Sequence, residues 1–147
     1  MSPRHGEPQR GKALLQSAFI YFAIVFGVGF LLGAVRVPFL VPRLGQRVAE
    51  LLEMPLMAAA IYCAAGWVVK RFGSSMQARG WALCGLLALA LLLGAEWLLA
   101  VALTGRGVAE YIASRDPVSG SVYLILLLVF AAMPRLRQGR TIHTLSA

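Results

Sequence analysis

Apolar stretches that are almost free of charged residues alternate with short charged connections along this chain. A helix rises about 1.5 Å per residue, so about 20 apolar residues cross the roughly 30 Å hydrocarbon core of a membrane. The stretches fall at about residues 13–36, 48–69, 80–103 and 117–134. The pattern predicts an all-α polytopic membrane protein, a four-helix transmembrane bundle in which residues 1–147 form a single membrane domain.

The second stretch is uncharged only from Met54 onward, which is short for a membrane span. We expect it to begin earlier, within residues 47–53, which would bring Glu50 and Glu53 to the membrane edge or inside it. The apolar positions in this segment repeat at helical spacing, as Val48, Leu51 and Leu52. We predict a short interfacial amphipathic helix that runs into the second span, with Pro55 either starting that span or kinking one longer helix.

Composition agrees with a membrane protein. Of the 147 residues, 59% are hydrophobic and only 14% are charged, whereas about a quarter of the residues of a soluble domain are charged. The net charge of +8 would suggest nucleic-acid binding in a soluble protein. Here the basic residues flank the apolar stretches, where they set topology and contact anionic lipid. We therefore expect membrane lipids, and not nucleic acid, as partners.

The basic residues are divided unequally between the two sides of the predicted membrane domain. One side receives Arg4, Arg10, Lys12, Lys70, Arg71, Arg79, Arg135, Arg137 and Arg140. The other side receives fewer, namely Arg36, Arg43, Arg47, Arg106 and Arg115. Since cytoplasmic connections of membrane proteins carry the excess of Lys and Arg, the N- and C-termini are both predicted to face the cytoplasm.

Charged residues inside a membrane or at its edge are costly unless they are paired or hydrated, so they are the first candidates for a site. Arg36 ends the first span, and Glu53 and Glu96 lie at a similar depth when helices are counted at about 1.5 Å per residue. We predict a partly buried cluster near the extracytoplasmic side that consists of Arg36, Arg43, Arg47, Glu50, Glu53 and Glu96.

The cluster has three interpretations. It is an ion-pair clasp that holds helix ends together, or a site open to the periplasm or outer leaflet, or a place where Glu96 pairs with a partner subunit. In the second case the arginines receive an anionic group and a carboxyl group exchanges a proton.

Gly29 and Gly33, four residues apart, would let another helix approach closely, either the second span or a second copy of the chain.

No catalytic, cofactor-binding or metal-binding motif stands out. His5 and His143 lie in the tails, and Cys63 and Cys84 are not arranged as a metal or thiol motif. Phosphate-binding loops and a Ser/His/Asp set are missing from the sequence as well. We therefore expect no cofactor and no bound metal.

Three segments carry a resemblance to known proteins, namely residues 33–36 (GAVR), 41–45 (VPRLG) and 49–55 (AELLEMP). Together with the basic end of the following span, they resemble a family of small four-span proteins of the bacterial inner membrane whose function is unknown. The resemblance covers the first half of the chain and implies an inner-membrane location without implying an activity.

The expected function is that of a non-enzymatic inner-membrane protein, a small structural or accessory subunit in a homo-oligomer or a larger membrane complex. The alternative is a small transporter, or a protein that binds lipid or an anionic ligand through Arg36, Glu53 and Glu96. A third hypothesis is a membrane enzyme that acts on lipid with Glu53 or Glu96 as the acid or base.

Overall fold

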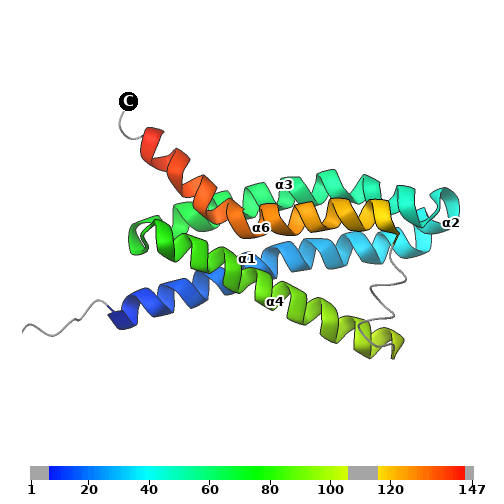
Figure 1. Ribbon diagram of the computed structural model, residues 1–147, viewed down its shortest axis with the longest axis horizontal. Helices are drawn as coiled ribbons and strands as arrows, with labels where there is room; N and C mark the ends of the chain where they lie inside the picture. The colour runs from blue at the N-terminus through cyan, green and yellow to red at the C-terminus, as the bar shows by residue number, and fades with distance from the viewer. Residues whose placement is uncertain (1–6, 106–115, 145–147) are drawn as a thin grey trace, which may run out of the picture.

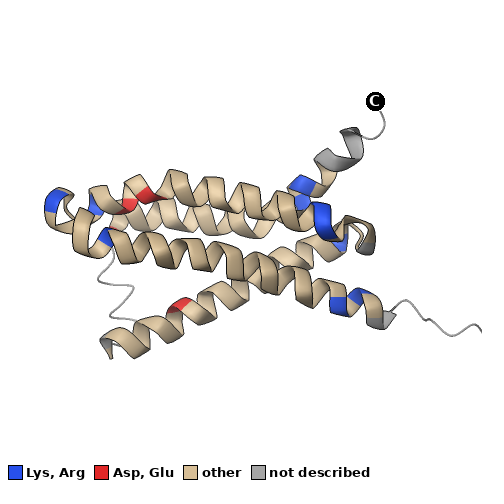
Figure 2. Ribbon diagram, turned by 180° about the vertical axis from the view of Figure 1, so that it is seen from behind, with Lys and Arg blue, Asp and Glu red and all other residues tan. Residues whose placement is uncertain are grey.

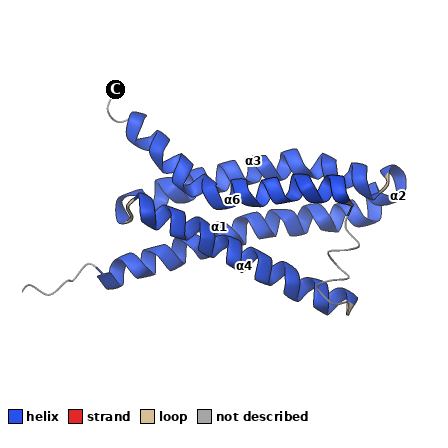
Figure 3. Ribbon diagram, viewed as in Figure 1, coloured by secondary structure: helices blue, strands red, loops and turns tan. Residues whose placement is uncertain are grey.

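Helices make up nearly all of the chain that the computed structural model describes, residues 7–105 and 116–144, and this part contains no strand (Figures 1 and 3). The elements are α1 (Glu7–Val35), the π-helical turn η1 (Arg36–Leu40), α2 (Val41–Leu44), α3 (Gln46–Phe72), the 3-10 turn η2 (Gly73–Ser75), α4 (Ala78–Thr104) and α6 (Pro117–Thr144). The predicted all-α fold class is confirmed.

Four of these helical segments are long and apolar enough to cross a membrane: Gln9–Leu44, Gln46–Phe72, Ala78–Leu103 and Pro117–Gly139. Each contains one of the spans predicted from the hydropathy pattern, extended at one or both ends. The lengths and composition of these segments support a multi-pass membrane protein.

The connection between the first two spans differs in detail from the predicted one. Residues 46–53 form the first turns of α3, which continues without interruption through Pro55. The short helix α2 continues α1 through the π-helical turn η1, and it ends at Leu44, directly before Gly45. Gly45 has φ +77°, a backbone conformation that a residue with a Cβ rarely adopts, so this glycine lets the chain turn between α2 and α3.

The four long helices lie side by side, with the start of α1, the end of α6 and the connection η2 at one end and α2 at the other (Figure 1). Both α3 and α4 pack against α1 and against α6. The expected packing of the first span on the second is therefore present. The core includes Tyr21, whose ring stacks on Phe130 with 4.5 Å between centroids and whose hydroxyl donates to the Phe130 carbonyl oxygen at 2.9 Å.

The backbones of α4 and α6 come into close contact at a glycine, Gly85. A Cβ placed on Gly85 would collide with the backbone carbonyl group of Ala131. A glycine at this point lets the two backbones meet, as small residues do at helix contacts in membranes. Gly85 was not among the packing glycines predicted from the sequence, Gly29 and Gly33, which lie on the first span.

Charged residues lie toward the two ends of the molecule (Figure 2). Lys and Arg occur at both ends, and the Asp and Glu drawn there lie in the half that contains α2. The central part of the helices is uncharged, as expected where helices cross the hydrocarbon core.

Candidate functional site

A cleft of about 590 Å³ lies between the four long helices. Its wall consists mainly of apolar side chains, and every one of α1, α3, α4 and α6 contributes to it. This volume is typical of pockets that hold small molecules, which range from about 300 to 1,000 Å³.

The cleft has a closed floor and an open side. On the floor, Phe130 and Ile61 are only 1% and 2% exposed. On the open side, Phe30, Val37 and Leu103 line the same cleft but are 54%, 61% and 75% exposed. Because these exposed side chains are apolar and belong to helices of membrane-spanning length, the opening is suited to face lipid rather than water.

Arg36 and two glutamates of α3 form the first polar group of the cleft wall. Arg36 Nε lies 3.2 Å from Glu53 Oε2, and its Nη1 lies 3.7 Å from Glu50 Oε1. The contact with Glu53 is an ion pair without hydrogen-bond alignment, although both of its atoms are enclosed. Glu50 Oε1 also accepts a hydrogen bond from Gln46 Nε2 at 3.0 Å.

Glu96 forms the second polar group, from α4. The hydroxyl of Tyr123 on α6 donates a hydrogen bond to Glu96 Oε2, and both residues line the cleft. Glu96 is half-buried. The cleft therefore places carboxylates of α3 and α4 beside the same apolar space.

The structure divides the predicted cluster. Arg36, Glu50, Glu53 and Glu96 line the cleft together. Arg43 is exposed on α2 and forms no ion pair with any residue in the described ranges. Arg47 points to a different partner, Asp116, which the sequence analysis did not include among its candidates.

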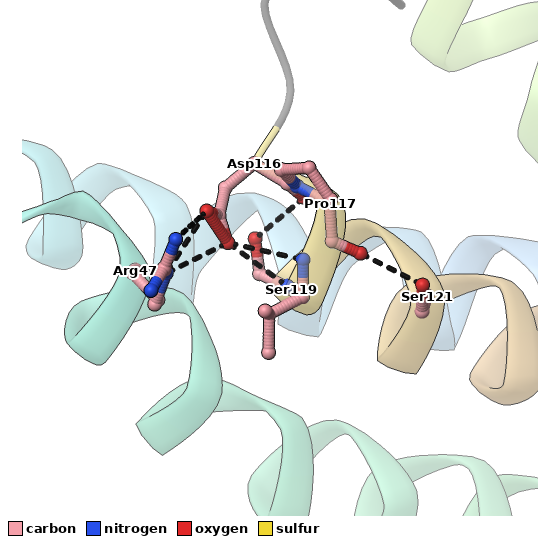
Figure 4. Close-up of polar contacts among 6 residues, drawn as sticks. Arg47, Asp116, Pro117, Ser119 and Ser121 are labelled. Carbon is pink, nitrogen blue, oxygen red and sulfur yellow. Dashed lines mark hydrogen bonds and ion pairs between the residues drawn. The ribbon is translucent and has the colours of Figure 1, made fainter.

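Arg47 and Asp116 join α3 to the start of α6 (Figure 4). Arg47 Nε donates to both carboxylate oxygens of Asp116 at 2.9 Å, and its Nη2 donates to Oδ1 at 2.6 Å. The Asp116 Oδ2 atom also accepts from the backbone N–H groups of Val118 and Ser119, at 3.2 and 3.3 Å. Asp116 is thus the N-cap of α6, with Pro117 in the first turn.

The Arg47 guanidinium holds the pKa of the Asp116 carboxyl below its ordinary value of 3.8, and the two backbone N–H groups act in the same direction. A carboxyl group whose pKa is lower in the folded state stabilises that state above its unfolded pKa. The stabilisation is lost as the pH falls through the lower, folded-state pKa. We expect the charge of Asp116 to raise the melting temperature at pH 7, and this contribution to decline as the pH falls below 3.8.

The Asp116→Asn variant tests this expectation, because Asn remains a good N-cap but carries no charge. The melting temperature of the wild type in detergent should exceed that of the variant at pH 7. The two should converge as the pH is lowered below 3.8. A difference that does not shrink as the pH is lowered from 7 to below 3.8 would show that the charge of Asp116 does not stabilise the fold.

The two predicted packing glycines occupy different surroundings on α1. A Cβ on Gly29 would lie 3.3 Å from Met57 Cε of α3, so Gly29 lies at the contact of α1 with α3. A Cβ on Gly33 would have no atom of its surroundings within 4 Å. Both glycines line the cleft. Whether Gly33 contacts a second copy of the chain stays a prediction.

Two polar residues of these sites were absent from the predicted cluster. Asp116 had a signal in the sequence, because Asp followed by Pro at the start of an apolar stretch is typical of a helix N-cap. Tyr123 had none, since a single tyrosine within an apolar span does not reveal which helix it faces.

Within the described part of the chain, the structure contains no group of His, Cys, Asp and Glu that could hold a metal ion. No family model matches the chain, and no curated protein or solved structure is significantly similar to it. The resemblance to small four-span proteins of the inner membrane stays a prediction.

Proposed function

We propose that this chain is a non-enzymatic, multi-pass protein of the bacterial inner membrane that holds one amphipathic, lipid-like molecule in the cleft between its helices. In this proposal the helices form a transmembrane bundle with both termini in the cytoplasm. The first turns of α3, together with α2, lie at the extracytoplasmic interface. The polar end of the cleft then lies near that interface, where the head group of a lipid is found.

The observation that supports this function is the form of the cleft. It has an apolar floor, an exposed apolar side, and one arginine and three glutamates in its wall. An amphipathic molecule has the same division, since its chain is apolar and its head is polar. A site of this kind gains free energy from burying the chain, while a few polar groups orient the head.

Accessory-subunit function is the second candidate. The exposed apolar side, which includes Phe30 and Leu103, would accept an apolar helix of another membrane protein as well as a lipid chain. In that case the cleft is filled in the complex and holds no lipid. Binding of a lipid by the isolated protein distinguishes the two functions.

The Gly33→Leu variant should block the cleft. The space around a Cβ at this position is open, so the new side chain projects from the cleft wall without a collision. The protein is placed in lipid nanodiscs with hexadecanol that carries a photoreactive diazirine on its chain. We expect wild type to be labelled at residues of the cleft, and Gly33→Leu to be labelled about tenfold less, which corresponds to about 1.4 kcal/mol of lost binding.

Gly27→Leu is the matched control. Gly27 lies on the same helix, has equally open surroundings and does not line the cleft. It introduces the same side chain and the same gain in helix propensity. Cleft labelling that is absent from the wild type, or that is equal in the two variants, would contradict lipid binding in this cleft.

A further inference from the structure

A second, smaller pocket of about 210 Å³ lies at the end of the molecule away from α2, between the start of α1 and the start of α4 (Figure 1). Arg10 and Leu14 of α1 line one side of it. Met76 and the first turn of α4, which includes Arg79, line the other side. No described residue lines both this pocket and the cleft, so the two are separate features.

The pocket lies at the level where two membrane-spanning segments begin. The first of these segments starts at Gln9 and the third at Ala78, so Arg10 and Arg79 are each the second residue of a span. Helices that cross a bilayer begin in the head-group region, just outside the hydrocarbon core. The pocket therefore opens at the depth where the phosphate groups of lipids are found.

The charge in the wall of this pocket is positive. Arg10 and Arg79 are the charged residues among the described ones that line it, and none of these is acidic. Both arginines are exposed, and neither forms an ion pair with a residue in the described ranges. The Asp and Glu drawn in Figure 2 lie in the other half of the molecule. Each guanidinium can therefore donate paired N–H groups to the oxygens of a phosphate.

The base of the pocket is apolar. Leu14 and Met76 line it, and both pack against the hydrophobic core. A Cβ on Gly80 would lie 3.2 Å from the Met76 Cβ, so Met76 lies close against the first turn of α4. Because burial of apolar atoms against Leu14 and Met76 gains free energy, this base favours a phosphate that carries an apolar chain over a free phosphate ion.

We propose that this pocket binds the head of an anionic phospholipid, with Arg10 and Arg79 donating to its phosphate oxygens and with the start of its acyl chain against Leu14 and Met76. Phosphatidylglycerol has such a head. Phosphatidylcholine carries the same phosphate but also a cation, which the arginines repel. This site goes beyond the proposed function, since it places a second lipid at the other end of the helices.

Two photoreactive lipids with different heads test the site. Phosphatidylglycerol and phosphatidylcholine, each with a diazirine on the acyl chain close to the glycerol, are added in trace amounts to the full-length protein in phosphatidylcholine nanodiscs. The measured quantity is the labelling of residues 10–14 and 76–80, expressed as the ratio of phosphatidylglycerol to phosphatidylcholine. The ratio is taken within each variant, so differences in the reactivity of the labelled residues cancel.

Four charge variants distinguish the pocket from the general positive charge of this end. Arg10→Gln and Arg79→Gln should each lower the ratio about fivefold, the effect of one basic residue beside an anionic head group. Lys12→Gln and Arg71→Gln are the matched controls, because both residues are exposed and basic and do not line the pocket. They should lower the ratio less than about twofold, since solvent and salt screen charges that are further from the lipid.

Gly11→Leu fills the pocket without changing a charge. Gly11 lines the pocket, and a Cβ there would have no neighbour within 4 Å, so the leucine is accommodated without a collision. The ratio should fall as it does in the two arginine variants. Gly27→Leu is the control on the same helix, since Gly27 has equally open surroundings and lines neither pocket.

Several results would overturn the proposal. A wild-type ratio near one would show that the pocket does not select an anionic head. Equal losses in the arginine variants and their controls, or a ratio that Gly11→Leu leaves unchanged, would show that the charge acts without this pocket. An excess of glycerol 3-phosphate should not displace the lipid, and displacement would assign the pocket to a soluble phosphate instead. The cleft is labelled with a different probe, so the proposed function is tested separately.

Discussion

Replacing Arg36 with Met should lower the free energy of unfolding by about 3 kcal/mol, because two carboxylates would then lie without a counter-ion in a largely apolar wall. The side chains of Arg36, Glu50 and Glu53 are only 25%, 13% and 15% exposed, so water replaces the guanidinium poorly. Reversible unfolding in mixed micelles with increasing dodecyl sulfate measures this loss.

Arg43→Met is the matched control for Arg36→Met. It removes the same charge from the same connection, but Arg43 is exposed and forms no ion pair with a described residue, so the unfolding free energy should change by less than about 0.5 kcal/mol. Adding Glu50→Gln and Glu53→Gln to Arg36→Met should restore most of the stability, since no buried charge then remains unpaired. Equal effects of Arg36→Met and Arg43→Met would contradict the ion-pair interpretation.

Substitution of Gly85 by Ala should be about as damaging as Arg36→Met, with an expected loss of about 3 kcal/mol. The added methyl group would meet the backbone carbonyl group of Ala131, and a backbone cannot rotate away as a side chain can. The helices α4 and α6 would have to separate along their contact, and this would also widen the cleft they share. The same unfolding measurement in micelles reports the loss.

Gly94→Ala provides the comparison for Gly85→Ala. Gly94 lies on the same helix, and a Cβ there would have no neighbour within 4 Å. Alanine should therefore stabilise α4 at this position by up to about 1 kcal/mol through helix propensity alone. If both alanine variants were equally stable, the close approach of α4 to α6 would not be a determinant of the fold.

Part of the candidate site could be predicted because charge is costly in a membrane. Arg36, Glu53 and Glu96 were grouped by their depth, and together with Glu50 they line one cleft. Depth gives only the position of a residue along the membrane normal, however, and it does not determine which side chains on different helices contact each other. Arg47 was assigned to the same group, although its guanidinium forms a bidentate ion pair with Asp116 instead.

The sequence by itself determined that this chain consists of helices of membrane-spanning length, with most of the charged residues outside the apolar stretches. These properties depend on how many apolar residues follow one another, which can be counted along the chain. Only the tertiary structure decided that Gly85 meets Ala131, that Tyr123 meets Glu96 and that a cleft opens between the helices. These properties depend on the rotation and crossing of apolar helices, and uniformly apolar sequences place few constraints on either.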